Sequence, residues 1–247
     1  MKRFLQLTID VNRWEDLTFF NNYRSLFADD TIVAFQKKVE NHIRWVVAHD
    51  ELFASKYEVC GDGILEDFFP DVDVDVFISH SHDDLDLAKA VAGYIQSKSR
   101  SLCFIDSCVW GNIDILLKNL NEKFCQKSIN LYDYDTSNHV TKHALIMLTT
   151  ALSRIMFKAS IFIFLNTRKS IVKREDDGRY YIKSPWLYHE LSFSRIMHDQ
   201  QMLIPENFSE NQKRANVWLN RVDIMYRAPV EHLTEISVAD LKRWWNE

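Results

Sequence analysis

The chain has 247 residues, of which 47% are hydrophobic and 26% are charged, so it is long enough to bury a sizeable core. Its formal net charge of -5 gives no basis for a nucleic-acid footprint or for a surface that binds anionic membranes. Four cysteines without C-x-x-C spacing are typical of reduced thiols, and Arg154 and Lys158 interrupt the most apolar stretch, which therefore does not indicate a membrane span. We expect a cytoplasmic protein with neither nucleic acid nor membrane as a partner.

The first part of the chain is predicted to be a helical N-terminal extension, residues 1–71, because it lacks the alternation of a strand. Asp29 can cap a helix whose apolar positions recur at three- and four-residue steps between Ile32 and Val46. Gly61, Gly63 and then Pro70 mark the end of this region, because glycine and proline interrupt helices. We therefore place a boundary near residue 71 and assign residues 72–247 to a second domain.

From residue 73 onward, strands and helices alternate. Strands are expected at 73–79, 102–106 and 160–166, with weaker candidates at 202–204 and 222–226. Helices are expected at 83–97, 113–125 and 141–157, then from Pro185, and last from a capping box at Ser237. This alternation predicts a mainly parallel sheet with helices on both faces. Right-handed crossovers leave few strand orders, and the flavodoxin-like order 2-1-3-4-5 is one of them.

Polar residues come directly after the first of these strands. A run of β-branched and aromatic residues stops at Ser79 and His80, and an acidic helix start follows at once. The carboxyl ends of parallel strands are where open α/β sheets bind ligands. We therefore expect Ser79 and His80 to line a crevice.

The same segment also has H-x-H-x-D spacing, formed by His80, His82 and Asp84. Two imidazoles and a carboxylate at this spacing can share a divalent metal, as in metallo-β-lactamase-like hydrolases. Such a site needs further ligands, and no second tight cluster of histidines accompanies it. The simpler interpretation is helix capping by Ser81 or Asp83, with acidic residues in the positive first turn. We predict no metal site.

A second motif begins at Ser184 and reads Ser-Pro-Trp-Leu-Tyr-His-Glu-Leu. Pro185 suits the first turn of a helix, and Trp186 and Glu190 are four residues apart, so they share one helix face. A carboxylate beside an indole can hold a ribose diol or stabilise positive charge on an anomeric carbon. The structural alternative is a carboxylate favoured by the helix dipole next to a core tryptophan.

An aromatic residue, Trp110, lies in the loop after the second expected strand. It can cover a ligand in the crevice, and the alternative is that it packs over the end of the sheet.

Together, the two motifs resemble those of a TIR (Toll/interleukin-1 receptor) domain. The segment from Asp75 to Asp84 is similar to the first strand and loop of that family, and Ser184 to Leu191 is similar to its S-P-W-x-x-x-E-L segment. Residues 104–106 and 161–165 fall where the family has its second and third strands. The resemblance implies a flavodoxin-like sheet of five parallel strands in the order 2-1-3-4-5.

The resemblance also implies a reaction, because enzymatic TIR domains cleave the bond between nicotinamide and ribose in NAD+. NAD+ is then the substrate and no resident cofactor is expected. The products are ADP-ribose or a cyclic ADP-ribose isomer, formed through an oxocarbenium-like state. Carried over to this chain, Glu190 is the catalytic residue. The implied substrate-binding residues are Ser79, His80, Trp186 and His189, to which we add Trp110.

The loop after the second strand lacks the R-D-x-x-P-G pattern of many receptor and adaptor TIR domains, which weakens a signalling-adaptor role. An additional polar stretch and helix at 127–157 resembles bacterial TIR proteins, including those of Thoeris-like anti-phage defence. By family, we expect self-association through TIR domains and a downstream effector that responds to a nucleotide product. The alternative hypothesis is a non-catalytic TIR interaction module in which Glu190 is structural.

Overall fold

The protein is described by a computed structural model. It covers residues 2–9, 18–20, 22–23, 69, 72–109, 117–118, 121–122, 125–128, 131–202 and 225–244.

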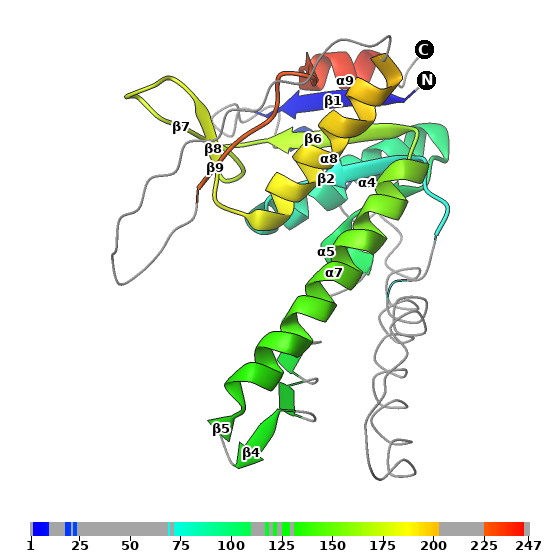
Figure 1. The fold of residues 1–247 in the computed structure, drawn as a ribbon. Coiled ribbons are helices and arrows are strands. Elements are labelled where there is room, and N and C mark those ends of the chain that lie inside the picture. Colours follow the sequence, from blue (N-terminus) through cyan, green and yellow to red (C-terminus); the bar gives the residue numbers. More distant parts are fainter. Residues whose placement is uncertain are drawn as a thin grey trace.

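A sheet of five parallel strands forms the centre of the molecule, with helices on both of its faces (Figure 1). Every neighbouring pair in this sheet is parallel, as the α/β prediction requires. The predicted fold class, a parallel sheet of flavodoxin-like type, is therefore confirmed. In spatial order, the strands are β3 (Cys103–Phe104), β2 (Val76–Ser79), β6 (Ile161–Asn166), β1 (Arg3–Thr8) and β10 (Thr234–Ile236).

The strand order differs from 2-1-3-4-5 at its fourth and fifth positions. The spatial order β3-β2-β6 matches the expected 2-1-3, but β1 and β10 take the places expected for strands at 202–204 and 222–226. Met202 instead ends a helix, and β9 (Tyr226–Arg227) belongs to a small antiparallel sheet with β7 (Val172–Lys173) and β8 (Tyr180–Ile182). Residues 203–224 lie outside the described residues.

The helical prediction for residues 1–71 is wrong at Arg3–Thr8, which forms strand β1. This segment pairs with β6 along its whole length and with β10 on its other side. Its apolar residues are buried on both faces, as is usual for a central parallel strand, so no two-residue alternation marks it as a strand. The helix expected from Ile32 to Val46 lies outside the described residues, and the boundary near residue 71 stays a prediction.

Several helices begin where their local signals indicate. The helix expected from 83 is present as a short 3-10 turn followed by α4 (Leu85–Ser99). The next long helix begins at Tyr134, earlier than the expected 141. It begins there because Asp133 caps it by accepting a hydrogen bond from the Thr136 amide at 2.9 Å. Most of the helix expected at 113–125 lies outside the described part. The helical elements and the remaining hairpin are η3 (His82–Asp84), α4 (Leu85–Ser99), α5 (Asp106–Val109), α7 (Tyr134–Lys158), α8 (Pro185–Met202), α9 (Val238–Trp244), β4 (Gln126–Ser128) and β5 (Leu131–Tyr132).

Alternate strand residues supply two hydrophobic cores, one on each face of the sheet. On one face, Phe77, Phe162 and Phe164 pack with buried residues of α7 and α8. On the other, Val76 and Ile78 pack with α4 and α9. Helix α8 is thereby held against the sheet with its first turns near the carboxyl end of β2. Among the described residues, no helix has the length and apolarity needed to cross a membrane.

Candidate functional site

Three neighbouring strands of the sheet end in polar residues at the same edge. β3, β2 and β6 are parallel neighbours, so their carboxyl ends lie together at the edge where open α/β sheets bind ligands. The polar residues at these ends are Ser79, the last residue of β2, His80 directly after it, Asp106 and Ser107 after β3, and Thr167 after β6.

The central contact of the site joins Ser79 to Glu190. The Ser79 hydroxyl donates a hydrogen bond of 2.5 Å to Glu190 Oε2 across 111 positions of sequence. Ser79 is 1% exposed and Glu190 is 3% exposed, so both groups are shielded from water. Ser79 is the last residue of β2, and Glu190 lies in the second turn of α8, which the sheet packing holds in place. The structure therefore brings together two residues that the sequence assigned to one crevice.

His80 lies beside this pair and contacts the start of α5. Its Nε2 shares a hydrogen bond of 3.1 Å with Ser107 Oγ, and its Nδ1 lies 3.8 Å from Asp106 Oδ1. The His80 side chain is buried, whereas the Asp106 side chain is 31% exposed and gives the site an accessible carboxylate. Asp106 and Ser107 are not among the site residues predicted from the sequence. The rule that selected Ser79, a polar residue at the end of a parallel strand, applies equally to them.

The electrostatic surroundings of Glu190 favour its protonated form. Burial raises the pKa of Glu190 well above its ordinary value of 4.5, the negative charge of Asp106 raises it further, and the hydrogen bond from Ser79 opposes this rise. The site therefore holds a buried carboxyl group whose protonated form is favoured, beside the partly exposed Asp106. Because a nearby cation lowers the pKa of a carboxyl group, a cationic ligand at this position favours ionisation of Glu190.

A separate polar cluster ties the loop after β2 to the loop after β6. The Thr167 hydroxyl donates a hydrogen bond of 2.5 Å to Asp84 Oδ2, and Lys169 Nζ lies 3.4 Å from Asp84 Oδ1. Lys169 Nζ also donates to the backbone carbonyl of Asp83 at 2.8 Å. We call these contacts the Asp84 clamp. The clamp fixes the segment that follows Ser79 and so supports the geometry of the site.

The three residues of the H-x-H-x-D motif do not converge. His80 contacts Ser107, Asp84 belongs to the clamp, and His82 is exposed. Within the part of the chain that the structure describes, no group of three or more His, Cys, Asp or Glu side chains is placed to hold a metal ion.

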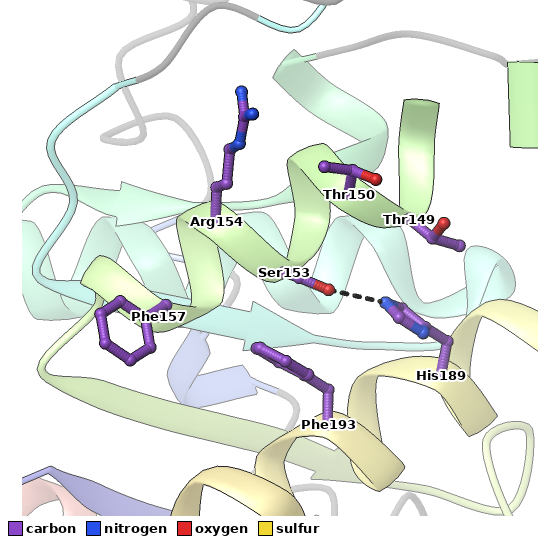
Figure 2. A pocket seen from close by; sticks show the side chains of 7 residues that line it. All are labelled: Thr149, Thr150, Ser153, Arg154, Phe157, His189 and Phe193. Atoms are coloured by element: carbon purple, nitrogen blue, oxygen red, sulfur yellow. Dashed lines mark hydrogen bonds between the residues drawn. The ribbon is translucent and has the colours of Figure 1, made fainter. Parts of the chain in front are cut away.

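The remaining predicted residues have contacts of other kinds or lie outside the described residues. Trp186 is partly buried and packs against the core cluster shared by the sheet, α7 and α8. Figure 2 shows His189 between α7 and α8, where its Nε2 shares a hydrogen bond of 3.3 Å with Ser153 Oγ. Burial lowers the pKa of His189 and favours its neutral form. Trp110 lies outside the described residues.

The structure thus unites Ser79, His80 and Glu190, adds Asp106, and places His189 on another side of α8. Comparison of the chain with protein-family models, curated proteins and solved structures finds no match. The chemistry of the site is therefore argued from its own residues.

Proposed function

We propose that the protein is a TIR-type NAD+ glycohydrolase or cyclase that cleaves the bond between nicotinamide and ribose, with Glu190 as its catalytic residue. The observation that carries the proposal is the buried Glu190 carboxyl group, held by Ser79 at the ligand-binding edge of a parallel sheet. The similarity of the Ser184–Leu191 segment to the W-x-x-x-E signature of enzymatic TIR domains supports the same assignment.

The proposed mechanism uses the protonation state of Glu190. The nicotinamide ring of NAD+ carries a positive charge, so its arrival at the site lowers the pKa of Glu190 and favours release of the Glu190 proton to water. The glycosidic bond then breaks, its electron pair moves to the ring nitrogen, and neutral nicotinamide leaves. The Glu190 carboxylate stabilises the positive charge that develops on the ribose carbon.

The neighbouring residues have supporting roles in this mechanism. The partly exposed carboxyl group of Asp106 attracts the cationic ring, and its charge adds to the effect of burial in raising the pKa of Glu190. The Ser79 hydroxyl fixes the orientation of the Glu190 carboxyl group, and His80 joins the ends of β2 and β3 through Ser107.

The second step determines the product. Attack by water on the ribose cation, with loss of a proton, gives ADP-ribose, and attack by a nucleophilic group of the same molecule gives a cyclic isomer. By its resemblance to bacterial TIR proteins, we place the reaction in anti-phage defence signalling. There the protein self-associates through its TIR domain, and the product activates a downstream effector.

The direct test is incubation of NAD+ with the wild-type protein and with Glu190→Gln, with and without a crowding agent that promotes assembly. Glutamine has nearly the same shape and keeps an oxygen that accepts the Ser79 hydrogen bond, but it cannot carry a negative charge. We expect nicotinamide release to fall by roughly 100-fold or more, the range seen when a group that stabilises transition-state charge is removed. Chromatography with mass detection identifies the second product.

A matched control is Glu175→Gln, which makes the same change at an exposed residue of the β7–β8 connection. It should leave nicotinamide release unchanged. Equal rates for wild-type and Glu190→Gln, or no release under either condition, would reject the enzymatic proposal. The burial of Glu190 would then favour the second candidate, a non-catalytic TIR interaction module.

A further inference from the structure

An apolar groove runs between α7 and α8 (Figure 2). It lies on another side of α8 from the Ser79–Glu190 contact. It consists of two adjoining hollows of about 430 and 280 Å³ that share Phe157 and Phe193 as walls. We call it the α7/α8 groove. Its lining combines the apolar side chains of Phe157, Phe193, Ile196 and Met197 with the cationic side chains of Lys2 and Arg154.

Large apolar side chains remain exposed in this groove. Phe157 is 67% exposed and Ile196 is 54% exposed, and they come from the two different helices that form its walls. Exposure of apolar groups that are gathered in one hollow, rather than scattered, is typical of an interaction site. Covering them would remove apolar area from water and so favour binding.

The charges of the groove all have one sign. Lys2 and Arg154 line it and no aspartate or glutamate does. In the described part of the chain, neither cation forms an ion pair with a carboxylate; Lys2 Nζ instead lies 4.4 Å from the centre of the Phe157 ring. Burial lowers the pKa of Lys2. A cationic groove on a chain of net charge -5 therefore favours an acidic partner.

The same charges disfavour the pairing of this groove with that of a second copy. A symmetric dimer places the same surface on both subunits, so Lys2 and Arg154 would face the same two cations. Like charges brought together in an interface cost free energy.

We propose that the α7/α8 groove docks an acidic amphipathic helix of another protein. The wall formed by α8 from His189 to Gln201 extends about 18 Å, which accommodates roughly three turns of a bound helix. Apolar anchors at i, i+3 or i+4, and i+7 fill the two hollows, and acidic residues beside them pair with Lys2 and Arg154. Because α8 also carries Glu190, a bound helix contacts the same element that holds the candidate catalytic group.

The test measures fluorescence anisotropy with two labelled synthetic helical peptides as probes. Both have leucines at the anchor positions, and they differ only in carrying glutamate or lysine on the flanks. We expect saturable binding of the glutamate peptide and about tenfold or more weaker binding of the lysine peptide. Arg154→Glu should reverse this preference, and Phe157→Ala should weaken binding of the glutamate peptide by about tenfold.

Ile146→Ala is the matched control, because Ile146 is 66% exposed on the same helix but does not line the groove. It should leave binding unchanged. The proposal is overturned if neither peptide binds saturably, if both bind equally, or if Ile146→Ala weakens binding as much as Phe157→Ala. Sedimentation velocity of the protein alone tests whether a second copy of the chain occupies the groove. Self-association that Phe157→Ala abolishes would assign the groove to a second copy and overturn the proposal. None of these measurements depends on NAD+ cleavage.

Discussion

Two buried carboxyl groups lie at the same edge of the sheet in different surroundings. Asp84 is 5% exposed and is matched by a cation and a hydroxyl group, because Lys169 lies 3.4 Å from one oxygen and Thr167 donates to the other. Glu190 is 3% exposed and receives a hydrogen bond from Ser79, but no cation pairs with it in the described part of the chain. The charge that acts on Glu190 is that of Asp106, which has the same sign.

This difference separates a buried carboxyl group that has a cation partner from one that has none in the described part of the chain. A buried negative charge that is paired and hydrogen-bonded helps to hold two loops together, whereas an unpaired one takes up a proton instead. Asp84 is of the first kind and Glu190 is of the second. Under the proposed function, a cationic substrate bound beside Glu190 would lower the pKa of this carboxyl group and favour its ionised form.

The largest expected effect on stability is that of Asp84→Ala. The change leaves the Thr167 hydroxyl and the Lys169 ammonium group without their buried partner. We therefore expect the free energy of unfolding to fall by about 2 kcal/mol. The effect is smaller than for a fully buried ion pair because the Lys169 side chain is 54% exposed. Chemical denaturation measures it. Asp83→Ala is the control, since the backbone carbonyl of Asp83 takes part in the clamp and remains; an equal loss there would contradict a specific clamp.

The second prediction concerns the pH dependence of stability. Because the pKa of Glu190 is raised in the folded protein, the stability that this group contributes is fully present below its ordinary value of 4.5 and is lost as the pH rises through the folded pKa. A glutamine side chain does not titrate, so Glu190→Gln should become more stable than the wild type as the pH increases, by at most about 1.4 kcal/mol per pH unit. Denaturation series between acidic and mildly basic pH test this. Parallel curves for the two proteins would show that Glu190 titrates normally.

The smallest expected effect comes from Asp106→Asn. Burial is the main cause of the raised pKa of Glu190 and the charge of Asp106 is the second, so removing that charge should lower the pKa only in part. At mildly basic pH, the stability gain from Glu190→Gln should be smaller in the Asp106→Asn background than in the wild type. A double-mutant cycle measures the difference, and full additivity would show that the two carboxyl groups do not interact.

The elements that were predicted correctly carry their signal in a short stretch of sequence. β2 and β6 are apolar runs bounded by polar residues, Pro185 begins α8, and the capping box at Ser237 is formed by reciprocal hydrogen bonds with Asp240. The elements that were missed depend on distant partners. The sequence of β1 resembles part of a helical region, and β10 has exposed or half-exposed side chains. β1 is a strand because its backbone pairs with β6 and β10, and β10 is a strand because its backbone pairs with β1.

The site shows the same division. The sequence by itself marked Ser79 and His80 as polar groups at a strand end, and the resemblance of the Ser184–Leu191 segment to TIR domains marked Glu190. Only the tertiary structure decided that Ser79 bonds Glu190, that Asp106 acts on the same carboxyl group, and that His189 lies in the α7/α8 groove instead. Burial and electrostatic coupling are properties of residues that folding brings together from distant parts of the chain, so no short stretch of sequence contains them.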